Sequence, residues 1–197
     1  GITVTRSSNA NVQSFSIRGA SEVAGGGIGN RVLLLLDGRP AITPESGGAL
    51  WNLVPLAAIE RIEVIKGAYS SLYGSSAMGG IVNVITRTPD TASHSDLNLH
   101  YGAYGPAPAY TGYKRYNDFF GAEFITSRKL NKWSYLFNFA GKSNDGNREQ
   151  SSFNLYNGYG KFKFDFSPNR SLQISAMYND IFNDTPATWL STTEAYS

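Results

Sequence analysis

The chain lacks cysteine altogether, so neither a disulfide framework nor a thiolate metal site can form. It also lacks a surplus of either charge, since 17 Lys and Arg against 15 Asp and Glu leave a formal net charge of +2. Proteins that bind nucleic acid usually carry a basic stripe, so we expect no nucleic-acid partner. Long apolar runs are missing too. The longest, residues 31–36, is far shorter than the roughly 20 residues of a membrane-spanning helix and fits one buried strand.

Glycine and aromatic residues are what the chain has in abundance. There are 21 Gly, and the aromatic fraction of 13% is mostly Tyr and Phe. Combined with few charges and no long apolar run, this composition is typical of a β-barrel rather than a helical bundle. The first residues show neither the basic start nor the apolar core of a signal peptide. We therefore expect the sequence to begin inside a longer protein.

Up to about residue 89, the apolar segments are short, branched and continuous. Examples are VLLLL from Val32, IEVI from Ile62 and IVNVI from Ile81. Such runs between glycines and prolines predict strands that are covered on both faces. Pro55 fits the first position of a short helix, and Asp37-Gly38 is a tight-turn signal. We predict a compact α+β unit for this half.

From about residue 93 the pattern changes to strict alternation. Trp133, Tyr135, Phe137 and Phe139 share one face of a segment whose other face is small and polar. Residues 156–166 repeat this arrangement. A soluble sandwich also alternates, but the aromatic richness and the length of these runs favour a wall with one face in lipid.

The spacing of the alternating segments gives an independent signal. We predict strands near 94–104, 117–129, 132–143, 153–166 and 171–182. The connections between them are long at 105–116 and 144–152, and short at 130–131 and 167–170. Outer-membrane barrels have short periplasmic turns and longer external loops, which produces this rhythm. The first strand would then start on the periplasmic side.

Four motifs in order resemble the plug domain of TonB-dependent outer-membrane receptors. They are FSIRG at 15–19, RVLLLLDGRP at 31–40, IERIEVIKG at 59–67 and SSLYGSSAMGGIVNVITR at 70–87. The resemblance implies an α+β plug domain over residues 1–90. Residues 91–197 would be the first five or so antiparallel strands of a transmembrane β-barrel. In this family the plug sits inside a barrel of about 22 strands, so we expect the chain to be a fragment, without the TonB box.

The resemblance also implies a function and its partners. Family members import ferric siderophores, haem or cobalamin across the outer membrane of Gram-negative bacteria, with energy from the TonB–ExbB–ExbD complex. They are not enzymes and need no cofactor of their own. One alternative is a surface or signalling receptor that uses the same plug without transport. Another is a soluble all-β enzyme, which the few, scattered carboxylates of the alternating half disfavour.

Three aromatic residues are candidates for contact with a substrate. Trp51, Tyr69 and Tyr73 lie in or beside the glycine- and serine-rich loops, where they could stack on a flat or hydrophobic ligand. The alternative is that they pack between the plug and the wall. The two histidines, His94 and His100, lie about 20 Å apart on one extended strand and cannot share a metal ion. A haem ligand at one of them stays open, and we predict no metal site.

Charged residues on covered strands need partners, because an unpaired buried charge is costly. Arg18, Arg61 and Glu63 lie on such strands. The resemblance implies that plug arginines pair with carboxylates of the barrel wall. Glu123 would face the interior if its neighbours Phe120 and Phe124 face lipid. We therefore predict an ion pair from Arg18 or Arg61 to Glu123. The alternative is that these charges are exposed to solvent in a wet gap between the plug and the barrel.

Overall fold

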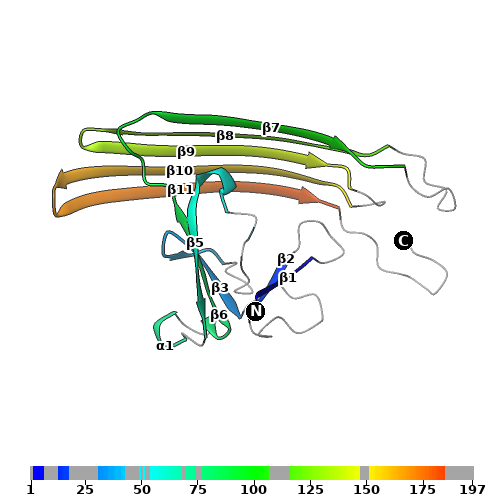
Figure 1. Ribbon diagram of the computed structural model, residues 1–197, viewed down its shortest axis with the longest axis horizontal. Coiled ribbons are helices and arrows are strands. Elements are labelled where there is room, and N and C mark those ends of the chain that lie inside the picture. Colours follow the sequence, from blue (N-terminus) through cyan, green and yellow to red (C-terminus); the bar gives the residue numbers. More distant parts are fainter. Residues whose placement is uncertain are drawn as a thin grey trace.

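The computed structural model describes residues 2–6, 13–17, 31–42, 49, 51, 54–67, 70–73, 77–106, 116–146 and 151–184. These residues form a hairpin of β1 and β2, a small sheet of order β4-β3-β6-β5 and a long sheet of order β11-β10-β9-β8-β7. The strands of the long sheet run across the direction of those in the small sheet (Figure 1). Within these ranges, no helix has the length and apolarity needed to cross a membrane.

The small sheet contains β3 (Val32–Leu36), β4 (Arg39–Pro40), β5 (Ile59–Lys66) and β6 (Gly80–Thr86). Strand β3 pairs in parallel with β6, and the other two pairings are antiparallel. Every residue of β3 is buried, which confirms the prediction of a strand covered on both faces. Asp37 and Gly38 take φ values of 47° and 78° between β3 and β4, the left-handed conformation of a tight hairpin turn.

Short elements connect these strands. The predicted helix at Pro55 is a 3-10 turn, η2 (Leu56–Ala58), and the proline is its N-cap residue rather than its first residue. Helix α1 spans Ser70–Tyr73. The antiparallel hairpin joins β1 (Ile2–Arg6) to β2 (Gln13–Ile17), whose last residue, Ile17, is fully buried.

The long sheet is an antiparallel meander in which each strand pairs with the next in sequence. Its strands are β7 (His94–Ala103), β8 (Asp118–Leu130), β9 (Trp133–Asn144), β10 (Phe153–Ser167) and β11 (Arg170–Asn183). Every boundary falls within one residue of the range that the alternation predicts. The strands are 10 to 15 residues long, enough for a tilted strand to cross a bilayer.

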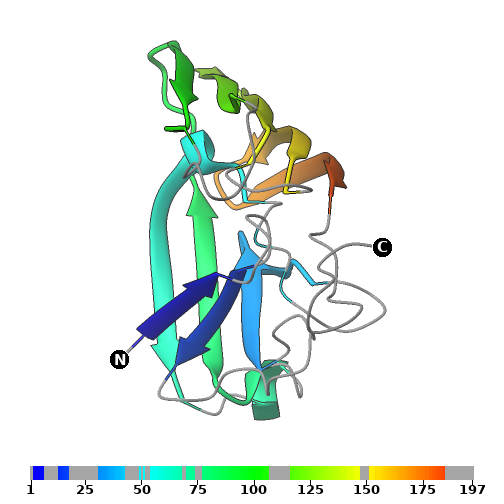
Figure 2. The ribbon, with the colours of Figure 1, turned by 90° about the vertical axis from the view of Figure 1, so that its right-hand side faces the viewer.

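The two faces of the long sheet differ as predicted. On the outer face, Phe139 is 56% exposed and Tyr178 is 67% exposed. On the inner face, Leu136 and Asn138 are fully buried, and Tyr159 is 3% exposed. Figure 2 shows the long sheet as a curved layer over one end of the small sheet, which the inner face covers.

One hydrophobic core joins the two sheets. Leu34, Val82 and Val84 of the small sheet belong to the same buried cluster as residues of the inner face, namely Ile125, Leu136 and Tyr159. A second cluster, which includes Leu33, Leu35 and Ile81, covers the opposite side of β3 and β6. In the described ranges, the aromatic outer face is left without a covering layer. The alternating half therefore buries its polar face and exposes its apolar face, the reverse of a soluble sandwich.

Candidate functional site

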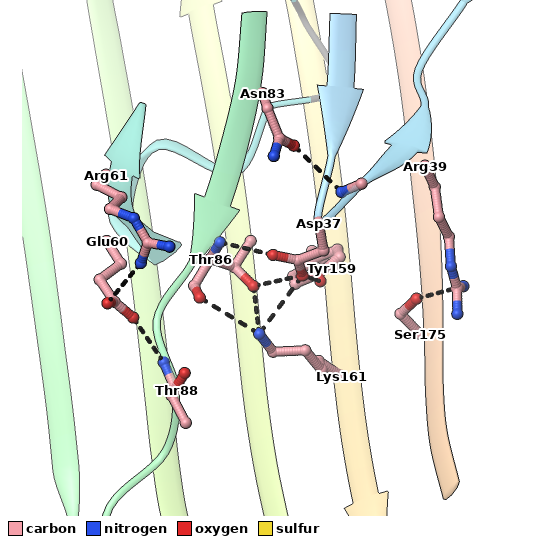
Figure 3. Close-up of polar contacts among 11 residues, drawn as sticks. Asp37, Arg39, Glu60, Arg61, Asn83, Thr86, Thr88, Tyr159, Lys161 and Ser175 are labelled. Atoms are coloured by element: carbon pink, nitrogen blue, oxygen red, sulfur yellow. Dashed lines mark hydrogen bonds and ion pairs between the residues drawn. The ribbon is translucent and has the colours of Figure 1, made fainter. Parts of the chain in front are cut away.

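The ends of β3 and β6 present a carboxylate and a hydroxyl to the inner face. Because the two strands are parallel neighbours, Asp37 and Thr86 meet where the carboxyl ends of both strands lie. The Thr86 amide donates to Asp37 Oδ1 at 2.8 Å, and its hydroxyl donates to Oδ2 at 2.7 Å. Both carboxylate oxygens are thereby fixed in position (Figure 3).

Strand β10 supplies the other half of this group. Tyr159 and Lys161 are two residues apart, so their side chains leave the same face of the strand. The Tyr159 hydroxyl donates to Asp37 Oδ2 at 3.0 Å, and Lys161 Nζ lies 3.4 Å from the same oxygen. Lys161 Nζ also donates to the hydroxyl and the carbonyl oxygen of Thr86. Its three N–H donors thus have three acceptors. We call Asp37, Thr86, Tyr159 and Lys161 the Asp37 cluster.

The electrostatics of the cluster favour an ion pair. Burial alone would raise the pKa of Asp37, but the hydrogen bonds from Thr86 and the charge of Lys161 outweigh it and hold this pKa below its ordinary value. The carboxylate is therefore ionised at neutral pH. Lys161 is only 8% exposed, so this pair joins the two sheets where little water reaches it. Removing one partner of such a pair is costly, because the other charge is left buried.

Two hydrogen bonds extend the contact on either side. Arg39 Nη1 donates to Ser175 Oγ of β11 at 2.9 Å. At the other side, the Ala57 amide of η2 donates to Glu123 Oε1 of β8 at 3.0 Å, and Asn138 Nδ2 donates to the same oxygen at 3.3 Å. The small sheet and η2 are thus bonded to β8, β10 and β11 of the long sheet.

Glu123 accepts the Ala57 amide on the inner face, and Arg61 pairs with other carboxylates. Arg61 Nε donates to Glu63 Oε1 at 2.9 Å, and its Nη1 donates to Glu60 Oε1 at 3.1 Å. These charges lie on β5, the edge strand of the small sheet, where the Arg61 side chain is 55% exposed. Charges in contact with water need no buried partner, so the local pairing suffices. Arg18, the other proposed donor, lies outside the described residues.

The candidate aromatic residues are not brought together in the described part. Trp51 is half-buried and packs against the core that the two sheets share, which favours the packing alternative. Tyr73 ends α1 and is 45% exposed. Tyr69 lies outside the described residues. A role in ligand binding stays a prediction for all three.

The Asp37 cluster was not predicted from the sequence. The sequence pattern places Asp37 only in a turn, and Lys161 only on the polar face of an alternating segment. A signal was present, because a lysine at the middle of a long strand's inner face needs a partner. The histidines form no such site. His94 pairs with Asp90, the His100 ring packs on Gly121, and no group of three or more His, Asp or Glu among the described residues could hold a metal ion.

Comparison with known proteins now identifies the family. The family model described as TonB-dependent Receptor Plug Domain matches residues 1–81, the part that contains the hairpin, β3, β4, β5 and the first two residues of β6. Residues 1–81 thus match the plug domain of TonB-dependent receptors. From here we call the small sheet the plug sheet and the long sheet the wall.

Curated relatives agree with this assignment over part of their length. The chain is 43% identical over 74 residues to the vitamin B12 transporter BtuB of Vibrio vulnificus, an alignment that covers 38% of this chain and 12% of BtuB. It is 43% identical over 95 residues to the iron-regulated outer membrane virulence protein of Vibrio cholerae, which covers 44% of this chain and 13% of the relative. The chain therefore spans a small part of the relatives it matches.

Solved structures extend the likeness through the wall. The unliganded ferric citrate transporter FecA superposes with a TM-score of 0.75 over 95% of this chain and 28% of FecA, at 20% sequence identity. At that identity the likeness shows the fold alone. It confirms the expected fold class, a plug domain followed by antiparallel strands of a plugged β-barrel.

Proposed function

We propose that this protein is an outer-membrane receptor that captures a scarce, bulky nutrient and imports it with energy from TonB. Candidate nutrients are a ferric siderophore, haem or cobalamin. The proposal draws on relatives whose names refer to vitamin B12 transport and to iron regulation. It includes no enzymatic step, and its partners are the TonB–ExbB–ExbD complex and the lipid of a Gram-negative outer membrane.

The observation that carries the proposal is the way the plug sheet is attached to the wall. A plug must block the barrel and must also be able to move. Among the described residues, the contact between the two sheets includes a shared apolar core, the Asp37 cluster and two further hydrogen bonds, all of them non-covalent. Each of these interactions can be broken and remade, which suits a gate that opens when it is pulled.

We also propose the division of the chain into a plug domain at residues 1–90 and wall strands at 91–197. The last strand of the plug sheet ends at Thr86, and the first wall strand begins at His94. The connecting residues run directly from the Asp37 cluster to the first wall strand. The short turns of the wall would lie at the periplasmic side and the long loops at the cell surface.

The test is uptake by cells that make the full-length protein and lack their own receptors. Labelled ferric siderophores, haem and cobalamin are supplied one at a time, with and without TonB. We expect one of them to accumulate only when TonB is present. Binding at the surface without accumulation would instead indicate the surface or signalling receptor. Recovery of the protein in the soluble fraction, after lysis without detergent, would rule out both.

A further inference from the structure

A row of basic side chains crosses the inner face of the wall just beyond the plug contact. Lys163 follows Lys161 by two residues on the same face of β10. The strand register pairs Lys163 with Ser134 of β9, and Ser134 with Lys129 of β8. Lys129, Ser134 and Lys163 therefore form one row across three strands, on the short-turn side of the Asp37 cluster.

The positive charge of this row is only partly neutralised. Asp165 Oδ1 lies 3.0 Å from Lys163 Nζ, and Asp165 Oδ2 lies 3.6 Å from Lys129 Nζ. Lys132 joins them from the β8–β9 turn, where its carbonyl oxygen accepts the amide hydrogen of Asp165 at 2.8 Å. Within the described ranges, the Lys132 ammonium has no ion-pair or hydrogen-bond partner. One carboxylate thus faces three ammonium groups.

The row lines a groove rather than a flat surface. A depression of about 600 Å³ is bordered by Lys129, Lys132, Lys163, Asp165, Phe166, Ser167 and Pro168. We call it the lysine groove. Both Lys129 and Lys163 keep 40% of their side-chain surface exposed, so a ligand can reach them. The volume falls in the usual range for small-molecule sites.

We propose that the lysine groove binds an anionic cargo, such as a carboxylate or catecholate iron chelate, on its way from the plug to the short-turn end. This inference rests on the proposed function and narrows its substrate to an anion. Ammonium groups attract such oxygens as strongly hydrated point charges, without demanding a fixed geometry. That property suits a site which a cargo passes through rather than one which holds it.

Membrane lipid is a poorer candidate for the anion. The row belongs to the inner face, whereas the aromatic residues next to it in sequence, Trp133 and Phe164, belong to the outer face. Those two rings pack against one another, with centroids 4.2 Å apart and planes tilted by 50°. A lipid headgroup could therefore meet the groove only at the rim of the wall, where Phe166 and the turn residues Ser167 and Pro168 border it.

The Asp37 cluster couples this groove to the state of the plug. While the plug is in place, the Lys161 ammonium is held by Asp37 and Thr86. When the plug leaves the wall, Lys161 loses both partners and stands about 7 Å along the strand from Lys163. Opening of the plug thus adds one more positive charge to the path at the moment when cargo passes.

The experiment measures import by the full-length protein carrying Lys129→Gln and Lys163→Gln together. The matched control is Lys142→Gln, because Lys142 belongs to the inner face of β9 but lies toward the long loops. Surface binding is measured in the cold, and import is measured after warming. For an anionic ferric chelate, we expect import by the double variant to fall about three- to tenfold, as for the loss of two partly exposed charges. Its surface binding and the control should stay within about twofold.

Two further arms decide between the outcomes. Asp165→Asn removes the only carboxylate of the groove, so it should leave anion import unchanged or faster. Raised salt should weaken the effect of the double variant, since it screens exposed charges. A wild-type protein that imports only uncharged or cationic cargo would overturn the inference and leave the proposed function intact. Unchanged import of an anion by the double variant would do the same.

Failure of the proposed function itself gives a different result. In that case the wild-type protein imports nothing in a TonB-dependent way. The groove is then tested on purified full-length protein in detergent at low salt, by retention of labelled ferric citrate. Retention that the double variant loses supports an anion site in its own right, and equal retention by both proteins overturns it.

Discussion

At the scale of single residues, the Asp37 cluster shows why a charge pair can lie between a plug and its wall. Asp37 accepts four hydrogen bonds or ion-pair contacts, and Lys161 donates to three acceptors. A buried pair that is satisfied in this way adds little net stability over an apolar pair of the same shape. The pair does fix the position of the plug on the wall, because a shifted plug would leave both charges buried and unpaired.

We predict that Lys161→Met weakens the contact by about 1–3 kcal/mol, because Asp37 loses its counter-charge and stays largely buried. The double variant with Lys161→Met and Asp37→Asn should recover part of the lost stability. A double-mutant cycle measures this recovery as a coupling free energy between the two residues. The measurement is the denaturant midpoint of the full-length protein in detergent. Lys163→Met, on the same face of the same strand but 40% exposed, is the control and should cost less than about 1 kcal/mol. Equal losses for the two lysines would contradict the role of the cluster.

At the scale of elements, the strands of the wall could be predicted because their information is local. A period of two and the loop lengths fix where β9 and β10 begin and which face is polar. The contacts of Asp37 could not be predicted in this way, since its wall partners lie 122 and 124 residues along the chain. The partners of Arg61 could not be predicted either, for a different reason. Charge and a covered strand predict that it needs a partner, but only the arrangement in space shows that β5 is an exposed edge.

Strand β6 depends on a glycine at its first residue. Gly80 has a φ of 144°, and an added Cβ would lie 2.6 Å from the Ile65 carbonyl oxygen and 2.8 Å from Ile17 Cδ1. We predict that Gly80→Ala destabilises the plug by about 1–3 kcal/mol from backbone strain alone, with the clash in addition. Gly38→Ala separates the two effects, because Gly38 has a φ of 78° but open space around it. The Tm of Gly80→Ala should be lower than that of Gly38→Ala. The reverse order would show that the clash at Gly80 does not contribute.

At the scale of the whole molecule, the wall has two different environments. Its inner face carries the buried polar residues and the lysine groove, while its outer face exposes aromatic and aliphatic side chains. The plug sheet covers the inner face only (Figure 2). This asymmetry favours the proposed membrane location, because water on the outer face would meet an extended hydrophobic surface.

The orientation of the wall in lipid can be tested with single arginines on β11. Ile174 lies on the outer face of β11, is 57% exposed and pairs with Phe162 of β10. Ile174→Arg should destabilise the protein folded in lipid vesicles by about 2–4 kcal/mol, as for a charge near the middle of a bilayer. Gln173→Arg changes the next residue, on the inner face opposite Lys163, and should cost no more than about 1 kcal/mol, from repulsion between the two cations. Phe182→Arg is on the outer face near the long loops, where the cost should fall to about 0–1 kcal/mol. Urea titration in vesicles gives the three values. Equal costs at 173 and 174 would mean that the two faces of β11 meet the same medium, and the proposed membrane location would then be wrong.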